Sequence, residues 1–295
     1  MTWNERYPEY CALIEAALPQ YLPPRELPQG KVCEAMAYSL LGGGKRIRGC
    51  LVLAMCELCG GKPEEALPFA AAVEMIHAYS LIHDDLPCMD NDDLRRGKPA
   101  CHIQFDEGTA LLAGDALLTH AFAAAASAYF NGSLPAETVL RCVNQLARAA
   151  GVEGMIGGQV IDTAHEEAPM APEQLEAMHG MKTGALIRAA AVLGCMAAGA
   201  PRDVVLQADL YAAKIGLAFQ IVDDILDVTE NSEELGKTAS DADNHKTTYI
   251  TLFGVEKAKE MVRQLVLEAD LAVKGTVLDD EILYELADTL AKRNH

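Results

Sequence analysis

Aromatic residues are scarce in this 295-residue sequence, since 6 Phe, 9 Tyr and 1 Trp make up only 5% of it. Basic residues are also few: 24 Lys and Arg stand against 43 Asp and Glu, which leaves a formal net charge of −19. So much negative charge repels nucleic-acid phosphates, so nucleic acid is not an expected partner. The remainder is rich in alanine and brings the hydrophobic share to 51%, a composition that suits a large helical core.

Several kinds of segment are missing too. No apolar run of membrane-spanning length stands out, so no integral membrane segment is expected. The first residues, Met1 to Pro8, lack a basic region followed by an apolar stretch, and so no signal peptide is expected. The 9 cysteines stand mostly among apolar residues, as reduced thiols do, and the expected location is cytoplasmic. Cys56 and Cys59 have the spacing of half a zinc site, but no second pair completes it.

Strand-type alternation of apolar and polar residues persists nowhere, and helical periodicity recurs instead, so the predicted fold class is all-α. No linker divides the chain, and a single domain is expected over 1–295, with an N-terminal helix and linker in 1–28. The longest polar segment, 231–248, is the expected lid loop. The predicted helices are 9–20, 31–41, 49–58, 64–86, 108–129, one ending near 150, others beginning at 172, 182 and 204, and then 255–273 and 279–293, with 97–101 as a loop.

Acidic side chains concentrate at the end of the predicted helix 64–86. Five aspartates, at positions 84, 85, 90, 92 and 93, fall within ten residues, and Arg95 and Arg96 follow closely. Carboxylates this close repel one another unless a cation neutralises them. Mg²⁺ is the natural candidate, because it prefers oxygen ligands and commonly shares them with substrate phosphates. The adjoining arginines indicate an anionic ligand, and the segment predicts a Mg²⁺–diphosphate site.

Asp223, Asp224 and Asp227 form a second acidic group within an apolar predicted helix. Asp223 and Asp227 are four residues apart, so they share one helical face. Three carboxylates in such surroundings are costly unless a metal ion or basic side chains compensate them. A chance pair of solvated helix faces is the alternative, and it accounts poorly for two such groups in one chain.

Two glycine-rich stretches attract notice. The first, Leu41 to Arg48, is no P-loop, because its glycine spacing is wrong and no Ser or Thr follows Lys45. Its glycines let the backbone approach an anion closely, and Lys45 and Arg48 are expected on one helical face. Taken alone, the stretch is equally well interpreted as a solvated helix start with two surface cations. The second, 151–158, indicates close packing between helices.

The two acidic groups, spaced as DDxxxxD and DDxxD, resemble the paired aspartate-rich motifs of the trans-isoprenyl diphosphate synthases. The resemblance covers nearly the whole chain from about residue 30. It is strongest to the bacterial farnesyl diphosphate synthases, with plant and bacterial geranylgeranyl diphosphate synthases next. It implies an all-helical bundle around a central cavity, and a homodimer. Further similar segments are 80–87, 94–97, 112–117, 182–188 and 216–220.

The resemblance also implies substrates and roles. Mg²⁺, about three ions with substrate bound and with Mn²⁺ as a substitute, would hold the diphosphate of dimethylallyl or geranyl diphosphate, and isopentenyl diphosphate would be the second substrate. The implied metal ligands, from both sides of the cavity, are Asp84, Asp85, Asp90, Asp223, Asp224 and Asp227. The implied contacts of the allylic diphosphate are Arg95, Lys182 and Lys237, and those of isopentenyl diphosphate are Lys45, Arg48, His77 and Arg96. Cation stabilisation is implied for Thr183 and Gln220, and a lid position for Lys246; the catalytic set is Lys182, Thr183, Gln220 and Lys237.

Two positions depart from the family's pattern. Gly49 stands where the family commonly has proline, which could loosen that helix start without removing a functional group. Asn91 replaces a frequent aspartate in the first acidic group, and similar relatives also carry asparagine there. Neither departure changes the implied function.

Product length is expected to depend on Tyr79, which lies five residues before Asp84, about 7.5 Å along the helix. Side chains tilt toward the helix N-terminus, so the ring could form the floor of the cavity. Family members with Tyr here resemble fifteen-carbon producers, and those with Met resemble twenty-carbon producers. The predicted reaction therefore gives farnesyl diphosphate by allylic ionisation, head-to-tail coupling and proton loss. The alternatives are a geranylgeranyl diphosphate synthase, and a Tyr79 that serves core packing alone.

Other functions explain fewer of these residues. A terpene cyclase would carry Ser or Thr and then Glu where this chain has Asp227 and Asn231, and has no use for a second diphosphate pocket. A di-iron bundle could use the pairs Glu74–His77 and Glu176–His179, but it leaves the aspartates and the basic residues unexplained. A non-catalytic partner subunit would have degraded acidic motifs, and both are intact here.

Overall fold

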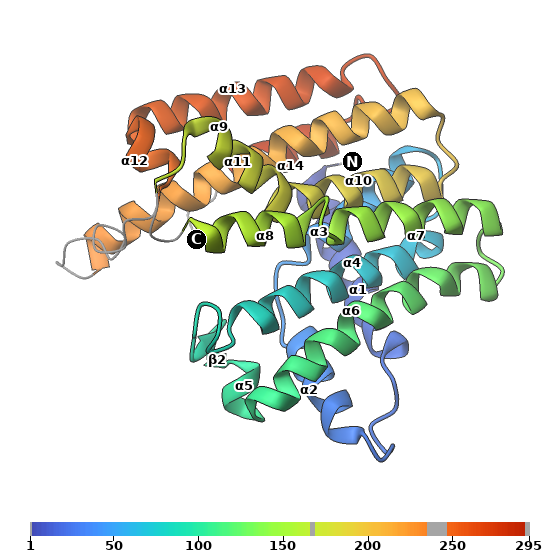
Figure 1. Ribbon diagram of the computed structural model, residues 1–295. Coiled ribbons are helices and arrows are strands. Elements are labelled where there is room, and N and C mark those ends of the chain that lie inside the picture. The colour runs from blue at the N-terminus through green and yellow to red at the C-terminus, as the bar shows by residue number, and fades with distance from the viewer. Residues whose placement is uncertain (1, 166–168, 235–246, 293–295) are drawn as a thin grey trace. The chain divides into compact units, whose positions relative to one another are not determined.

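The computed structural model describes residues 2–165, 169–234 and 247–292, and its regular structure there is almost entirely helical (Figure 1). One two-stranded sheet is the exception within these ranges, so the predicted all-α class is confirmed. The chain divides into two compact units. The first comprises Arg6–Asn144 with Met196–Gly199, and the second comprises Met1–Glu5, Gln145–Cys195 and Ala200–His295. Most of the predicted lid lies outside the described residues, and 231–234 belong to the preceding helix.

The first unit is built around helix α4 (Pro63–Asp84), whose side chains are buried on nearly every side, as in a core helix. Helix α6 lies alongside it (Figure 1). The close approach depends on Gly114, because a Cβ there would lie 2.1 Å from Nε2 of His83. The other elements are α1 (Trp3–Ala17), η1 (Leu18–Tyr21), α2 (Gly30–Leu40), α3 (Ile47–Leu58), β1 (Leu94–Arg95), β2 (Lys98–Pro99), α5 (Cys101–Gln104), α6 (Glu107–Phe130) and the first part of α7 (Ala136–Ala150).

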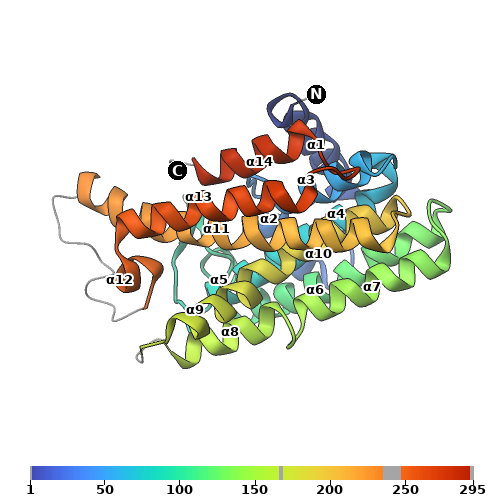
Figure 2. The same cartoon turned by 90° about the horizontal axis from the view of Figure 1, so that it is seen from above.

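The second unit is built around α11 (Arg202–Glu234), which runs alongside α13 (Figure 2). Ile221, Met178, Tyr249 and Val262 belong to one apolar cluster, which joins α9, α11, α12 and α13. This cluster fixes the part of α11 that carries the second acidic group. The other elements are α8 (Met155–Ala164), α9 (Pro172–His179), the π-helical turn η2 (Gly180–Gly184), α10 (Ala185–Ala197), α12 (Tyr249–Phe253), α13 (Val255–Val273) and α14 (Glu281–Ala291).

Two helices are long and apolar enough to cross a membrane by length and composition, namely α6 and residues Arg202–Val228 of α11. Core helices pass the same test, and these two pack against α4 and α13. Neither helix is therefore assigned to a membrane, and the absence of an integral membrane segment stays a prediction.

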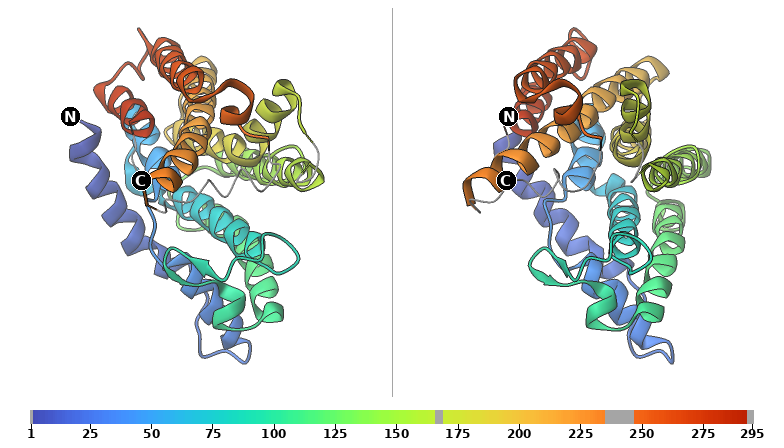
Figure 3. Two further views of the ribbon diagram at one scale, coloured as in Figure 1. Left: turned by 90° about the vertical axis from the view of Figure 1, so that its left-hand side faces the viewer. Right: turned by 60° about the vertical axis from the view of Figure 1, so that its left-hand side comes forward.

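Three local predictions were wrong. The expected loop 97–101 contributes to a hairpin, because β1 pairs with β2 around Arg96 and Gly97 (Figure 3). Both turn residues have positive φ, 53° and 72°, as a two-residue type I′ hairpin requires. Helix α3 begins at Ile47, so Lys45 precedes it and shares no helical face with Arg48. Lys182 lies in η2 and α10 begins only after it.

Candidate active site

The first aspartate group occupies the end of α4 and the tight turn that follows. The backbone N–H of Asp90 donates to the carbonyl of Asp84 at 2.8 Å, and that of Asn91 donates to Leu86 at 3.2 Å. Asn91 has a φ of 54°, a left-handed conformation that asparagine adopts more readily than most residues. The backbone conformation of this turn therefore explains why asparagine is suited to position 91. The turn brings Asp84, Asp85 and Asp90 into one short segment.

Asp85 is held by Arg95, which projects from the hairpin. Nε of Arg95 donates to both carboxylate oxygens, at 2.9 and 3.2 Å, and Nη2 also bonds Oδ1. Because Asp85 is only 2% exposed, burial raises its pKa, and the hydrogen bonds from Arg95 offset only part of this rise. The same contacts raise the pKa of Arg95. Arg95, which was predicted to bind a diphosphate, therefore neutralises Asp85, which was predicted to bind a metal ion.

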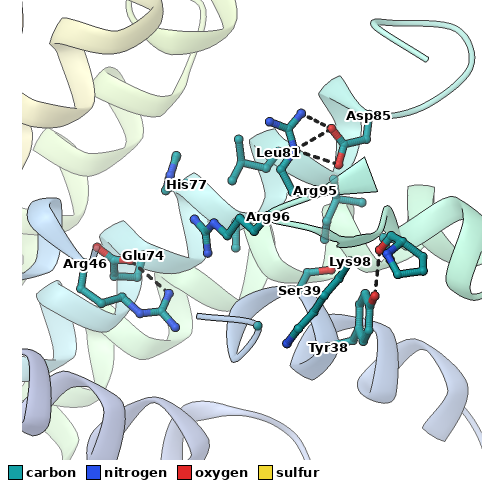
Figure 4. Close-up of a pocket in the computed structure, with 15 residues that line it drawn as sticks. Tyr38, Ser39, Arg46, Glu74, His77, Leu81, Asp85, Arg95, Arg96 and Lys98 are labelled. Carbon is teal, nitrogen blue, oxygen red and sulfur yellow. Dashed lines mark hydrogen bonds and ion pairs between the residues drawn. The ribbon is translucent and has the colours of Figure 1, made fainter. Parts of the chain in front are cut away.

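A pocket in the same unit lies between α2, α4 and the hairpin, and basic side chains dominate its polar lining (Figure 4). The charged and titratable residues that line it are Arg46, Glu74, His77, Asp85, Arg95, Arg96 and Lys98. Two residues of the predicted isopentenyl diphosphate set, His77 and Arg96, are in this lining. Arg48 is not part of it, although its charge contributes to a lowered pKa of His77.

Arg46 is a structural member of this pocket. It is 5% exposed, and its guanidinium donates to Glu15 at 2.6 Å, to Glu74 at 3.3 Å and to the carbonyl of Leu40 at 2.7 Å. Glu74 accepts a further bond, at 2.9 Å, from the backbone N–H of Gly49. A proline at position 49 has no N–H to donate. The glycine that departs from the family's pattern therefore supplies a buried hydrogen bond.

Arg96 is held differently. It has left-handed backbone, its Nη1 donates to the carbonyl of Gly43, and its guanidinium lies against Gly44, where a Cβ would come within 2.5 Å of Nη1. Within the described ranges it forms no ion pair with a carboxylate. Burial and then the nearby Arg46 lower its pKa. An anion bound beside Arg96 would relieve this unfavourable field.

His77 shares that field. Burial, followed by the charges of Arg48 and Arg96, lowers its pKa well below the usual range. The imidazole is therefore neutral at pH 7. It can donate one hydrogen bond to an anion and accept another without adding charge.

The second unit places Gln220 at the centre of a hydrogen-bond network. Its amide oxygen lies 3.0 Å from Oγ1 of Thr183 and 3.1 Å from Nδ1 of His179, and its Nε2 donates to Asp223 at 3.4 Å. The ring of His179 stacks on Tyr249, with centroids 5.7 Å apart. The network links η2 to the second acidic group and brings together Thr183, Gln220 and Asp223.

Two further contacts complete this part of the site. The backbone N–H of Tyr249 donates to Oδ2 of Asp224 at 2.8 Å. Lys182 donates to Asp162, which is 6% exposed, at 2.5 Å. A Cβ on Gly158 would lie 2.1 Å from the backbone N of Lys182, which confirms close helix packing as the reason for that glycine. Lys237 and Lys246 lie outside the described residues.

The carboxylates fit Mg²⁺ by their chemistry. Within the described residues no three His, Cys, Asp or Glu side chains converge as a ready-made metal site. Mg²⁺ commonly takes one or two carboxylates and completes its shell with water and substrate phosphates, so a ready-made cage is not needed. The raised pKa of Asp85 means that its buried charged form gains stability from an added cation.

Sequence reasoning missed several residues that shape the site: Arg46, Glu74, Asp162, His179 and Tyr249. Glu74 and His179 did carry a signal, because each belongs to a Glu-x-x-His pair. Their partners in the structure are Arg46 and Gly49 for Glu74, and Gln220 for His179. These contacts account for both residues without iron.

An all-helical chain with two aspartate groups, the first bonded to Arg95 and the second linked through Gln220 to the turn η2, has the features of an isoprenoid synthase. A sequence model of the polyprenyl synthetases matches residues 29–278. The chain therefore belongs to the polyprenyl synthetase family and is a prenyltransferase.

Relatives and solved structures agree with this assignment. The chain is 51% identical over 288 residues to the heterodimeric geranylgeranyl pyrophosphate synthase large subunit 1, chloroplastic, of Arabidopsis thaliana, covering 96% of this chain and 77% of the relative. It is 44% identical over 283 residues to farnesyl diphosphate synthase of Bacillus subtilis, covering 96% and 95%. The crystal structure of an FPP/GFPP synthase from Zymomonas mobilis superimposes with a TM-score of 0.85 at 35% identity, covering 98% of both chains.

Proposed function

We propose that this protein is a farnesyl diphosphate synthase, which condenses isopentenyl diphosphate with dimethylallyl or geranyl diphosphate. The observation that carries the proposal is Arg96, a cation that lines the pocket, has a lowered pKa and has no carboxylate partner among the described residues. It stands beside neutral His77 and directly follows Arg95, which is bonded to Asp85. This arrangement suits an anion pocket next to a metal-binding acidic turn. A synthase with two diphosphate substrates needs both.

The six aspartates of the two groups would hold Mg²⁺, or Mn²⁺ in its place, as about three ions when substrate is bound. Bound there, the metal would neutralise negative charge as the allylic C–O bond breaks. Arg95 would turn from Asp85 to the allylic diphosphate, joined by Lys182 and Lys237, with Lys246 on a lid. The implied metal ligands are Asp84, Asp85, Asp90, Asp223, Asp224 and Asp227.

The residues around Gln220 would act on the carbon skeleton. Its amide oxygen and the hydroxyl of Thr183 supply partial negative charge toward an allylic cation, and His179 keeps the amide oriented through its bond at 3.1 Å. The cation is attacked by the double bond of isopentenyl diphosphate, and a proton then leaves. No protein nucleophile is required. Arg48, His77, Arg96 and Lys45 would bind the diphosphate of isopentenyl diphosphate.

We assign farnesyl diphosphate as the main product because of Tyr79. Its side chain is only 5% exposed, and its hydroxyl oxygen is buried without a hydrogen bond among the described residues. A tyrosine that serves packing alone usually finds a partner for its hydroxyl. The bulk of the Tyr79 ring would therefore matter more than its hydroxyl, because the ring would form the floor of an apolar cavity and limit the length of the product. The relatives include farnesyl and geranylgeranyl diphosphate synthases, so a twenty-carbon product is the alternative.

We also infer a homodimer, in which both compact units form one polyprenyl synthase domain, because the family model spans residues of both. Large apolar side chains on α6 and α7 are exposed, including Phe130 at 82% and Leu140 at 70%, as a surface covered by a second copy would be. A cytoplasmic location suits the cysteines, since each of the 9 stands without a disulfide bond in the structure.

The two arginines of the hairpin test the proposal. Arg96→Gln removes a charge-assisted contact of about 1.5–3 kcal/mol, so the KM for isopentenyl diphosphate should rise about 10- to 150-fold. The KM for geranyl diphosphate should stay within about twofold, because Arg96 is assigned to the other substrate. Arg95→Lys should show the opposite selectivity while keeping a cation for Asp85.

The control is Arg263→Gln, an exposed arginine on α13, which should leave both constants unchanged. Steady-state kinetics with each substrate varied in turn provide the measurement. Equal effects of Arg96→Gln on both substrates, or no effect on isopentenyl diphosphate, would contradict the assignment.

A further inference from the structure

Two ion pairs join helix α1 to α3 and to Arg46, the residue before α3, and two thiols lie between these ion pairs. Sγ of Cys11 on α1 lies 3.6 Å from Sγ of Cys50 on α3. Both helices carry these residues within the first compact unit, so the contact is internal to it. The two ion pairs are Arg6–Glu57 and Arg46–Glu15, each with a closest approach of 2.6 Å. Because an ion pair holds the helices together on either side of the cysteines, the two sulfur atoms stay in van der Waals contact.

The two thiols differ in access and acidity. Cys11 is half-buried, whereas Cys50 is fully buried. Hydrogen bonds from Cys50, and then from Tyr7, lower the pKa of Cys11 to about 7 against the effect of burial. Burial, and then the hydrogen bond to Cys11, raises the pKa of Cys50. Cys11 is thus the accessible thiolate and Cys50 the protonated partner, which is the arrangement of a reactive cysteine and a resolving cysteine.

We propose that Cys11 and Cys50 form a peroxide-sensitive modification site, whose disulfide alters the anion pocket through the start of α3. The Cys11 thiolate attacks one oxygen of hydrogen peroxide, which gives a sulfenic acid and hydroxide. The Cys50 sulfur then displaces the hydroxyl group, and the departing oxygen leaves as water with the Cys50 proton. In total two thiols and one peroxide give one disulfide and two water molecules.

Closure of the disulfide must draw Cys11 and Cys50 together. The sulfur atoms have to approach from 3.6 Å to about 2.05 Å. The neighbouring position is already tight, since a Cβ on Gly49 would lie 2.9 Å from Ile14 on α1 and 3.2 Å from Glu74. A shift of Cys50 therefore disturbs the bond from Gly49 to Glu74, the carboxylate that also holds Arg46.

A second connection runs through Tyr7. Its hydroxyl donates to the carbonyl of Lys45 at 2.5 Å and also contacts the Cys11 sulfur. Oxidation of Cys11 removes the thiolate that competes for this proton. Both routes lead to the segment 45–49, whose Lys45 and Arg48 bind isopentenyl diphosphate in the proposed function, and this part of the inference rests on that function. Oxidation should therefore change binding of that substrate in particular.

The experiment exposes the purified full-length protein to one equivalent of hydrogen peroxide and maps its thiols by mass spectrometry after proteolysis. A linked peptide joining Cys11 to Cys50, two hydrogens lighter and reversed by dithiothreitol, is expected to form first among the nine cysteines. Initial reaction at Cys88 or Cys59, or conversion of Cys11 to sulfinic acid without the linked peptide, would overturn the site. This readout needs no enzyme activity, so it stands apart from any failure of the proposed function.

The pocket effect is tested on the same sample. The KM for isopentenyl diphosphate should rise about threefold or more on oxidation, while that for geranyl diphosphate changes less than twofold. The Cys50→Ala variant should lose both the cross-link and the kinetic response, and Cys59→Ser, at the other end of α3, should keep both. If Cys50→Ala folds poorly, the half-exposed Cys11→Ser provides the same comparison. A cross-link that forms without any change in the KM for isopentenyl diphosphate would overturn the coupling to the pocket.

Discussion

Replacement of Tyr79 tests how the protein sets its product length. In the wild type the ring is 5% exposed and packs edge-on against His83, with centroids 5.7 Å apart. Forcing another isoprene unit past such a ring should cost about 1–3 kcal/mol, the usual cost of overpacking. That cost corresponds to about a 5- to 150-fold slower fourth-unit addition. Tyr79→Ala removes it, so geranylgeranyl diphosphate should become the main product.

Stability separates this effect from general damage. Tyr79→Ala should lower the free energy of unfolding by about 3–5 kcal/mol, because a large buried ring is lost. Tyr79→Phe keeps the ring and removes a buried hydroxyl that costs about 1–3 kcal/mol, so it should be at least as stable as wild type. Tyr79→Met should lengthen the product with a smaller loss of stability.

The assay separates the dephosphorylated products by chain length, at equal isopentenyl diphosphate and with geranyl diphosphate as primer. The Phe variant is the matched control and should keep the fifteen-carbon product. An unchanged product profile for Tyr79→Ala would show that the ring serves packing alone. A longer product from Tyr79→Phe would also refute the reasoning, because it would move the control of length from the ring to the hydroxyl.

Three other predictions concern the surrounding residues. Gly158→Ala should lower the melting temperature and the activity, because its Cβ would lie 2.1 Å from Lys182, whereas Gly180→Ala, which meets nothing within 4 Å, should change neither. Lys182→Ala should cost about 3–5 kcal/mol in urea unfolding by leaving buried Asp162 without its cation, and an added Asp162→Asn should restore stability but not activity. The pKa of His77 is lowered by folding, so the stability that it contributes is present above about pH 6.5 and is lost as the pH falls below that value. Urea unfolding at pH 6.5 and 5.5 should therefore show wild type losing up to about 1 kcal/mol more than His77→Gln, and equal losses would contradict a neutral His77 in the folded protein.

The sequence was most informative where a local rule decides the structure. The helix before Asp84 was predicted because an alanine-rich apolar run can only be a buried helix here, and α4 ends at that residue. The type I′ turn at Arg96 was not predictable, since arginine rarely adopts positive φ and the turn carries a single glycine. Its reason is tertiary, because the turn places Arg96 against Gly43 and Gly44.

The site residues also divide into those that a local pattern predicts and those that depend on tertiary contacts. Spacing was enough to nominate the aspartates as candidate metal ligands, because two acidic groups on apolar helices need compensation wherever the chain takes them. Partners distant in sequence could not be read in this way. Nothing in the spacing links Glu74 to Arg46, or Lys182 to Asp162, since 28 and 20 residues separate the members of these pairs. Such contacts depend on how helices pack, and they decide which charges are neutralised and which remain for a ligand.

The most direct measurement incubates the purified protein with Mg²⁺, isopentenyl diphosphate and either dimethylallyl or geranyl diphosphate, and identifies the product by chain length. Farnesyl diphosphate as the main product from both primers, with condensation abolished by chelation of the metal, is the predicted result. Condensation to geranylgeranyl diphosphate would contradict the assigned product and the role of Tyr79. No condensation with either primer would contradict the proposed synthase activity itself.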